Sequence, residues 1–385
     1  MFKFLRRILV DLWLTYMPTG KPLEGFAFIV HPRDYGDVVS NVPLLKKLPK
    51  AWVMKYFHLV WPFTVSKIKG VKSLKTGKDL IGWVIGVPIF AHEMMEDRDL
   101  ARRKIAKGVR LARHRGAAVV GLGGLTGSMT EGGAGLTKRD GFTITAGRAY
   151  TSFVVKSYAD DVIEKFGLKR EDLTIAIVGA AGGVGTAVTN LIFEEPYKHT
   201  ILVDLERKLE HVANLIKDKK KTGFEITHQI GAVKKADIII TVTNAPEAIV
   251  GSDDITPGTV IIDDAQPSDI SKEIIDARKD ILVIEAGVLS AHEHIKVGTN
   301  FRLANPNELY CCLSEAMAIA ASDWGGTYEP RNITPELIAT ISGIAQEMGF
   351  RLAPYQAYGK IVAQEQIQNV KNLLRQKLYS QNDTI

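Results

Sequence analysis

Short apolar runs separated by longer amphipathic stretches dominate the second part of the chain. The apolar runs occupy residues 173–178, 200–203, 238–243, 260–262 and 281–284. Continuous apolar runs of this length are typical of strands buried in a parallel sheet, and parallel strands need helices or long connections between them. The pattern therefore predicts an α/β fold with a Rossmann-type, doubly wound parallel sheet over residues 151–300.

Weaker periodicity marks the two regions that flank this domain. Before it, short apolar runs mixed with helical spacing predict an α/β substrate domain over 23–150. We expect a basic helix over 97–115, interrupted at Gly108, and a long helix over 145–165 that leads into the sheet. After the sheet, residues 301–385 predict helices that return to the cleft between the domains.

Residues 1–22 combine cations with an apolar run. Asp11 interrupts the run and no small-residue cleavage site follows, so the segment lacks the pattern of a secretory signal peptide. Residues 1–17 either form an interfacial helix, with Lys3, Arg6 and Arg7 at the level of lipid headgroups and Trp13 below them, or pack onto the body of the protein. No apolar stretch reaches the ~18 residues of a membrane span.

Composition narrows the class of protein. With 385 residues, 46% apolar and 24% charged, the chain is long enough for two cores and does not have the composition of a disordered protein. Its two cysteines, Cys311 and Cys312, are adjacent and ill placed to bridge each other, which is typical of a reducing compartment such as the cytoplasm. We expect no metal site, because the histidines lack convincing partner ligands.

The net charge of +6 is unevenly distributed. Residues 1–150 contain 25 Lys and Arg against 11 Asp and Glu, a net charge of +14, whereas the remainder has a net charge of −8. Residues 98–115 contain eight Lys and Arg and one acid, Asp99. This asymmetry predicts an acidic partner for the first domain only, although a solvated helix face has the same pattern. No nucleic-acid-binding module is recognisable, so we do not expect nucleic acid as the partner.

A glycine-rich sequence follows the first apolar run of the predicted sheet. Gly179 permits a tight turn, Gly182 lets the backbone approach a pyrophosphate, and Gly185 allows close packing of helix on strand. The phosphates of a dinucleotide would then lie at the N-terminus of the next helix, where unpaired N–H groups and the helix dipole favour anions. The loop residues expected to contact the cofactor are Gly179, Ala181, Gly182, Gly183, Val184 and Gly185.

Residues beyond the loop bear on which dinucleotide binds. Asp204 ends the next apolar run, where a carboxylate accepts hydrogen bonds from the adenosine ribose and repels a 2′-phosphate, so it favours NADH over NADPH. Arg207 is close enough in sequence to accommodate a 2′-phosphate instead. Thr243 and Asn244 lie at and just after the end of the apolar run at 238–243 and either line the nicotinamide or form a plain turn.

The cysteine pair lies on a helix expected to begin near Asn307. On this helix Cys312 belongs to an apolar stripe, and Cys311 is rotated about 100° away from it toward Glu315. A thiol on such a stripe beside a nicotinamide can accept an acyl group, because one thiolate replaces another. A small cysteine in an ordinary core gives the same pattern. The stripe consists of Leu309, Cys312, Leu313, Ala316, Met317 and Ala320.

Four segments together resemble the long-chain acyl-acyl-carrier-protein reductases of the cyanobacterial type, which form fatty aldehydes. They are GLGGLT (121–126), TAG (145–147), IVGAAGGVGTAV (177–188) and CLSEAM (312–317). The likeness extends from about Phe26 to Leu352. The resemblance implies that Cys312 is the acyl-accepting residue and that the cofactor is NADPH. After the TAG segment the family usually has a polar residue and a histidine, where this chain has Arg148-Ala149-Tyr150.

The resemblance also implies a reaction and its partners. Cys312 would take the acyl group from a thioester of acyl carrier protein or coenzyme A, and hydride from NADH or NADPH would release a fatty aldehyde for an aldehyde-consuming enzyme. Oxyanion donors would come from the Gly123-Gly124 backbone or the Thr126 side chain, with Tyr150 as a further donor. Glu315, one turn after Cys312, would support the site or lie at a domain interface. The aromatic-rich segment 51–63 would line an acyl channel or form ordinary core.

Two other functions are compatible with the same residues. The first is a dehydrogenase of a small hydroxy or amino acid, similar in fold to shikimate dehydrogenases, in which Cys312 is dispensable. The second is a non-catalytic protein that binds a carrier protein or a membrane and senses a dinucleotide. Acyl transfer to Cys312 separates the reductase from both.

Overall fold

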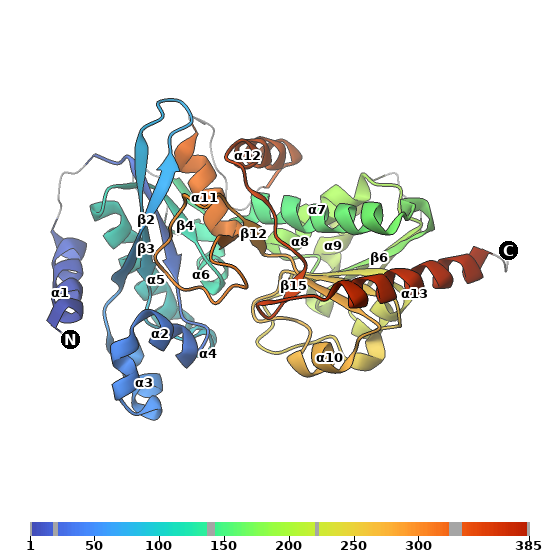
Figure 1. The fold of residues 1–385 in the computed structure, drawn as a ribbon, viewed down its shortest axis with the longest axis horizontal. Coiled ribbons are helices and arrows are strands. Elements are labelled where there is room, and N and C mark those ends of the chain that lie inside the picture. The colour runs from blue at the N-terminus through green and yellow to red at the C-terminus, as the bar shows by residue number, and fades with distance from the viewer. Residues whose placement is uncertain (1, 18–21, 137–142, 220–222, 323–332, 383–385) are drawn as a thin grey trace. The chain divides into compact units, whose positions relative to one another are not determined.

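The computed structural model describes residues 2–17, 22–136, 143–219, 223–322 and 333–382 (Figure 1). The chain folds into two compact units. The first unit comprises Met1–Tyr150, Ser290–Ile333 and Thr340–Arg351, and the second comprises Thr151–Leu289, Thr334–Ala339 and Leu352–Ile385. The predicted C-terminal segment, 301–385, therefore contributes to both units.

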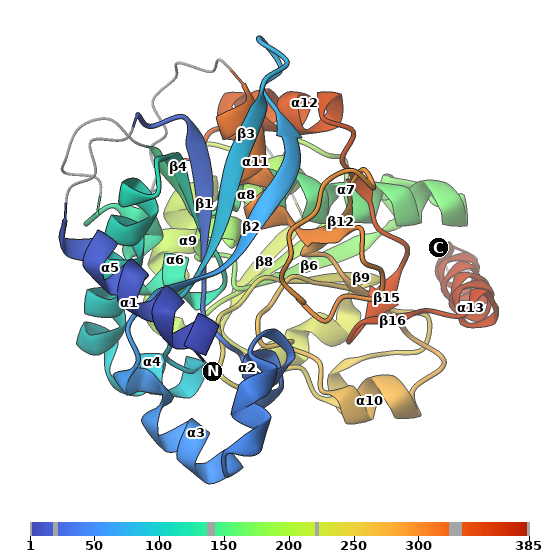
Figure 2. The ribbon, with the colours of Figure 1, turned by 60° about the vertical axis from the view of Figure 1, so that its left-hand side comes forward.

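The first unit is built on a five-stranded mixed sheet with the order β2-β3-β1-β4-β5 (Figure 2). The strands β2 and β3 form an antiparallel hairpin, whereas β3, β1, β4 and β5 run parallel. Because parallel strands end at the same edge of a sheet, the residues that follow β1, β4 and β5 come together there. The strands are β1 (Gly25–Val30), β2 (Phe63–Lys72), β3 (Asp79–Gly86), β4 (Ala117–Leu122) and β5 (Thr143–Thr145).

Helices cover the two faces of this sheet. Ala27 and Ile29 of β1 share a hydrophobic cluster with residues of α5 (Arg98–His114). Gly121 of β4 faces α11 (Cys311–Ala321), and a Cβ built on it would lie 2.8 Å from the Cβ of Ala316. Side chains alternate along a strand, so α11 approaches the opposite face from α5, and its close approach requires glycine at position 121.

The basic helix differs from its prediction in two respects. α5 continues through Gly108, where we expected an interruption. Gly108 is buried, and a Cβ on it would lie 3.2 Å from a methyl group of Val87, so this glycine permits close packing and does not break the helix. The cations are also not all on the surface, because Lys104 is buried and donates to the Val60 carbonyl at 2.9 Å.

Short helices complete the first unit. In the aromatic-rich segment 51–63, Val53, Phe57 and Phe63 are buried, whereas Trp52 is 64% exposed. The segment thus supplies core residues from one side and exposes an aromatic side chain on the other. The short helices are α2 (Tyr35–Asn41), η1 (Pro43–Lys47), α3 (Lys50–Tyr56), η2 (Phe57–Leu59), α4 (Ala91–Glu96), α6 (Leu125–Met129) and η3 (Glu131–Gly133).

The N-terminal helix α1 (Phe2–Tyr16) packs onto the first unit, as one of our two interpretations predicted. Asp11 is fully buried, accepts a hydrogen bond from the Thr64 N–H at 2.7 Å and forms an ion pair with Arg115. The side chain of Lys3 lies outside the described part of the structure. Among the residues described, no helix has the length and apolar character needed to cross a membrane.

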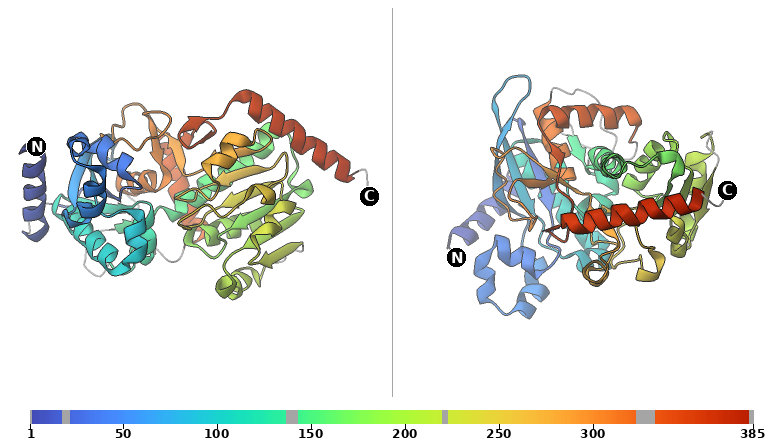
Figure 3. Two further views of the ribbon diagram at one scale, coloured as in Figure 1. Left: turned by 90° about the horizontal axis from the view of Figure 1, so that it is seen from below. Right: turned by 45° about the vertical axis from the view of Figure 1, so that its right-hand side comes forward.

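The second unit contains a six-stranded sheet with the order β11-β10-β9-β6-β7-β8, in which all neighbouring strands are parallel. The strand order reverses at β6, which lies between β7 and β9, and helices cover both faces (Figures 1 and 3). This topology confirms the predicted doubly wound α/β fold. The strands are β6 (Thr174–Val178), β7 (His199–Val203), β8 (Phe224–Thr227), β9 (Ile238–Thr241), β10 (Val260–Asp263) and β11 (Leu282–Glu285).

Two elements of this region depart from the prediction. β8 was not predicted, because its residues are partly exposed at the sheet edge and lack a continuous apolar run. The long helix α7 begins at Arg148 and not at Thr145, which belongs to β5. The remaining helices are α7 (Arg148–Phe166), η4 (Arg170–Asp172), α8 (Gly183–Phe193), η5 (Glu206–Lys208), α9 (Leu209–Ile216), η6 (Ile230–Lys235), η7 (Ser252–Asp254), α10 (Lys272–Ala277), α12 (Pro335–Glu347) and α13 (Gln364–Asn382). The short strands are β12 (Val288–Ser290), β13 (Glu308–Tyr310), β14 (Arg351–Leu352), β15 (Gln356–Ala357) and β16 (Lys360–Ile361).

Candidate active site

The glycine-rich loop joins β6 to α8 in the second unit. Gly179 has a φ of 90°, and a Cβ on Gly185 would overlap the Gly179 carbonyl oxygen, so the turn and the helix–strand contact both need glycine. Gly182 is the N-cap of α8 and has no side chain with which to cap the helix. The first N–H groups of α8, from Gly183 and Val184 onward, are therefore available to an anion such as a pyrophosphate.

Asp204, after β7, is bonded to this loop. Its carboxylate accepts the Ala181 N–H at 2.7 Å and the Leu205 N–H at 2.8 Å, and the Lys208 ammonium lies 3.7 Å away. The carboxylate thus stabilises the loop, a role that we did not predict. Each of its oxygens has a second lone pair, so a ribose hydroxyl can still donate to it. Arg207 is exposed on η5, beside this carboxylate in sequence.

The carboxyl ends of β9 and β10 carry a group of buried acids that the sequence analysis missed. Thr243 donates to Asp269 at 2.6 Å, and Thr241 donates to Asp263 at 2.7 Å. Burial raises the pKa of Asp269 to about 7 and also raises the pKa of Asp263. The Thr243 side chain is thereby fixed beside Gly179, whose Cβ would lie 3.0 Å from the Thr243 methyl group, whereas Asn244 is exposed.

In the first unit, α11 begins at Cys311, later than predicted, because Leu309 belongs to β13. Cys311 is 1% exposed and is therefore a core cysteine, whereas Cys312 is half-buried. Gly147, just after β5, has a φ of 75°, and a Cβ on it would overlap the Cβ of Cys312. Cys312 therefore lies in the first turn of α11, against the residues that follow β5 at the carboxyl edge of the sheet.

Glu315 connects α11 to the turn that contains Gly147. Its side chain is fully buried, accepts a hydrogen bond from the Thr145 hydroxyl and accepts the Tyr150 N–H at 2.7 Å. The Thr145 hydroxyl oxygen in turn accepts the Gly147 N–H at 2.9 Å. Glu315 thus binds the first turn of α7, where the helix dipole favours a negative charge. This contact lies within the first unit.

The other two predicted side chains are engaged differently. The Thr126 hydroxyl is fully buried and donates to the Gly123 carbonyl at 2.7 Å, so it stabilises the loop after β4 and is not directed at a ligand. The Tyr150 side chain is 2% exposed, and its pKa is raised by burial and by the charge of nearby Cys311. Tyr150 therefore stays protonated at neutral pH, and its hydroxyl lies near Cys311.

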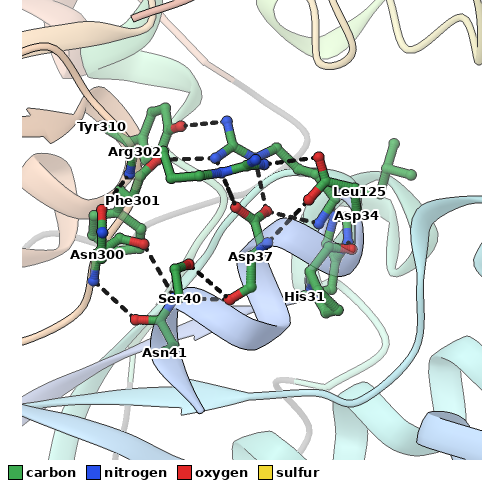
Figure 4. A network of polar contacts seen from close by, with 12 residues as sticks. His31, Asp34, Asp37, Ser40, Asn41, Leu125, Asn300, Phe301, Arg302 and Tyr310 are labelled. Atoms are coloured by element: carbon green, nitrogen blue, oxygen red, sulfur yellow. Dashed lines mark hydrogen bonds and ion pairs between the residues drawn. The ribbon is translucent and has the colours of Figure 1, made fainter. Parts of the chain in front are cut away.

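A polar network that sequence reasoning missed holds the segment before α11 (Figure 4). Arg33 forms an ion pair with Asp37 at 2.8 Å and donates to the Tyr310 hydroxyl at 3.0 Å. Arg302 forms a second ion pair with Asp37 at 2.7 Å. Tyr310 is the N-cap residue of α11, so these contacts help to fix where the cysteine helix begins.

His31 belongs to the same region and was also missed. Its Nε2 accepts the Leu125 N–H at 3.2 Å, and its Nδ1 donates to the Pro32 carbonyl at 3.2 Å. Burial lowers the pKa of His31, which keeps it neutral in this role. The polar residues directly after the apolar run of β1 were the available signal, because they had to fall at the carboxyl edge of a parallel strand.

Comparisons with known proteins relate the chain to several enzymes. Residues 161–285 match the family described as shikimate / quinate 5-dehydrogenase. The chain is 22% identical to aminotransferase PigE of a Serratia species over 92% of its length, but it spans only 43% of that protein. It is 26% identical to long-chain acyl-[acyl-carrier-protein] reductase of Synechococcus elongatus over 72% of its length and 84% of that protein's.

Solved structures similar to the chain include L-tryptophan dehydrogenase from Nostoc punctiforme, with a TM-score of 0.36, 14% identity and coverage of 96% of this chain and 91% of that one. An NAD-dependent malic enzyme from Thermotoga maritima gives a TM-score of 0.38 and 15% identity, covering 91% and 90%. The family match lies within the second unit. The second unit has the fold of a nicotinamide-dependent oxidoreductase. A nicotinamide dinucleotide is accordingly the cofactor that the glycine loop fits.

Replacing Gly147 with alanine tests the contact with Cys312. The methyl group would overlap the Cys312 Cβ and the positive φ adds strain, so we expect the free energy of unfolding to fall by about 3 kcal/mol. Urea unfolding followed by tryptophan fluorescence measures it, since the tryptophans of the described residues, Trp13, Trp52, Trp61 and Trp83, belong to the first unit. Gly77→Ala is the matched control, because Gly77 has a φ of 68° but its Cβ would meet no described atom within 4 Å. Equal losses in the two variants would contradict the contact.

The pKa of Asp269 predicts a pH-dependent stability. The folded state binds this proton more tightly than the unfolded chain, so the stabilisation is complete below the ordinary pKa of 3.8 and is lost as the pH rises through about 7. Asp269→Asn keeps an oxygen for the Thr243 hydroxyl and has no proton to lose. We expect its unfolding free energy, from urea unfolding followed by circular dichroism, to fall less than that of the wild type between about pH 5 and about pH 8.

The control for this experiment is Asp253→Asn, which changes an exposed acid of the same unit. It should show the pH dependence of the wild type. If Asp269→Asn does so as well, the Asp269 carboxyl does not hold a proton near neutral pH.

Proposed function

We propose that the chain reduces a long-chain acyl thioester of acyl carrier protein or coenzyme A to a fatty aldehyde, by way of an acyl group on Cys312. One observation carries the proposal: of two adjacent cysteines, Cys312 is accessible in the first turn of α11 while Cys311 is buried. A helix N-terminus stabilises a thiolate, which is the nucleophilic form of cysteine. The similarity to an acyl-[acyl-carrier-protein] reductase over 72% of the chain supports the same reaction.

In this proposal the Cys312 thiolate attacks the thioester carbonyl, and the carrier thiol leaves with the proton. A nicotinamide bound at the glycine loop would supply the hydride for the thioester carbonyl, and Cys312 would then leave as the thiolate when the thiohemiacetal collapses to the aldehyde. Of the predicted oxyanion donors, the Gly123 N–H already donates to the Ile29 carbonyl at 2.9 Å, so the Gly124 N–H is the donor that we propose. Glu315 and Gly147 position Cys312 and do not react.

The cofactor that we propose is NADH. Asp204 keeps a buried negative charge at the end of β7, where a 2′-phosphate would otherwise lie, although Lys208 at 3.7 Å offsets part of it. NADPH is the alternative that the resemblance implies. The ratio of the two dissociation constants, measured by quenching of the protein's fluorescence, decides between them.

The carrier, in this proposal, docks on the exposed arginines of α5. Arg98, Arg102, Arg103 and Arg110 are exposed, whereas Lys107 lies 3.9 Å from the ring of Trp61 and Arg115 pairs with Asp11. An acidic carrier protein would be attracted to these four arginines. A partner enzyme that consumes the aldehyde fits the same scheme.

A second candidate rests on the family match of residues 161–285. A dehydrogenase of a small hydroxy or amino acid would use the same dinucleotide site, but Cys312 would not be acylated. A non-catalytic dinucleotide-sensing protein would bind the cofactor without turnover. The identity of the residue that carries an acyl group therefore separates the three functions.

Incubation with palmitoyl-coenzyme A without nicotinamide, followed by intact-protein mass spectrometry, tests the proposal. We expect the wild type to gain the mass of one palmitoyl group, because no hydride is present to release it. Cys312→Ser should lose the hydroxylamine-sensitive adduct, and Cys311→Ser, the matched control, should retain it. A wild type without an adduct, or an adduct that survives in Cys312→Ser, rejects the mechanism.

A further inference from the structure

The N-terminal helix α1 buries Leu14 and two polar residues, and it leaves much of its apolar surface exposed. Asp11 and Thr15 are fully buried, whereas Leu9, Trp13 and Tyr16 are 63%, 58% and 52% exposed. The inward polar residues are satisfied by the Thr64 N–H, by Arg115 and by the bond from the Thr15 hydroxyl to the Asp11 carbonyl. A helix that packs on a globular protein normally buries its apolar stripe and exposes its polar one. The outward face of α1 therefore has the apolar composition of a surface that another molecule covers.

A second exposed apolar group lies beside α1 (Figure 2). Trp52 and Leu59, from α3 and η2, are 64% and 71% exposed. Beneath them Val53 and Phe57 belong to a hydrophobic cluster against which Ile8 of α1 also packs. We call the exposed residues of both elements the interfacial face: Leu9, Val10, Trp13, Tyr16, Met17, Leu48, Trp52, Tyr56 and Leu59.

Cations predominate in the sequence around the interfacial face, although Glu93 of α4 bonds His58 of η2 at 2.9 Å. Residues 38–78 contain nine lysines and no Asp or Glu. Four of these lysines are exposed within or next to α3, and the exposed Arg6 lies on α1. The acid of α1, Asp11, is buried and paired with Arg115. A partner of this face must therefore be both apolar and anionic. The four lysines are Lys46, Lys47, Lys50 and Lys55.

We propose that the interfacial face docks the protein on a bilayer that contains anionic lipids. Exposed tryptophan and tyrosine together with lysine are the residues that favour the boundary between headgroups and acyl chains. Lysines near such a surface add electrostatic attraction to anionic headgroups. A second copy of the chain is a poorer occupant, because it would present the same cations to this face. The protein lies on the membrane in this proposal and does not span it.

Sedimentation with lipid vesicles tests the docking in the absence of any substrate, so its outcome is independent of the proposed reaction. We expect the full chain to bind vesicles of equal parts phosphatidylcholine and phosphatidylglycerol, and to bind phosphatidylcholine alone at least about tenfold more weakly. Added salt should weaken the binding, because it screens the lysines.

Variants locate the binding on the protein. Trp13→Gln and Trp52→Gln change exposed side chains, so the fold should be retained, and each should weaken binding about tenfold by removing an aromatic anchor. Tyr379→Gln, which changes a 64% exposed tyrosine of the second unit, is the matched control and should bind like the wild type.

Three results would overturn the proposal. The first is equal binding by the wild type and by Trp13→Gln and Trp52→Gln. The second is binding that does not depend on phosphatidylglycerol. The third is an absence of vesicle binding together with a dimer, seen by sedimentation velocity, that these variants dissociate, because the face would then join two copies of the chain.

Discussion

The buried carboxylate of Glu315 is the contact on which the candidate acyl site depends. It accepts hydrogen bonds from the Thr145 hydroxyl and the Tyr150 N–H, and so binds α11 to the turn between β5 and α7. Removal of one partner from such a buried network leaves an unsatisfied polar atom, which costs more than the network itself contributes. The turn in between contains Gly147, which no other residue type could replace without displacing Cys312. The position of the thiol therefore follows from the fit of one helix against one turn.

In the second unit, a few residues shape the candidate dinucleotide site. Gly179 and Gly185 bring the first turn of α8 against the end of β6, and Asp204 holds the loop between them through the Ala181 N–H. An anionic ligand at this loop would be bound by backbone N–H groups and the helix dipole and not by a cationic side chain. Such a site is specified mainly by residues that are small, which is why it is recognisable in a sequence.

The sequence predicted those parts of the fold that depend on burial. The strands β6, β7, β9, β10 and β11 were recognisable because they are buried on both faces and are therefore continuously apolar. β8 is partly exposed and has no such run. Gly108 looked like a helix break because close packing against Val87 cannot be read from local sequence.

Less of the candidate site could be predicted, because its contacts cannot be read from local sequence. The sequence placed Cys312 on an apolar stripe and Cys311 off it, whereas the structure buries Cys311 and half-exposes Cys312, and the helix starts later than the stripe suggested. The bonds of Asp204 to the loop, of Glu315 to Thr145 and of His31 to Leu125 join residues far apart in the chain. Contacts of this kind are set by tertiary structure, and no spacing of residues in the sequence predicts them.

The central claim is that a group bound to Cys312 is reduced by hydride. The most direct measurement isolates the acylated protein free of thioester and adds NADH or NADPH in a single turnover. The account predicts that the acyl mass disappears from the protein at the same rate as the nicotinamide absorbance falls, in a ratio of one to one, with release of a fatty aldehyde. An acyl group that stays on Cys312, or that leaves as a fatty acid without oxidation of the nicotinamide, would contradict it.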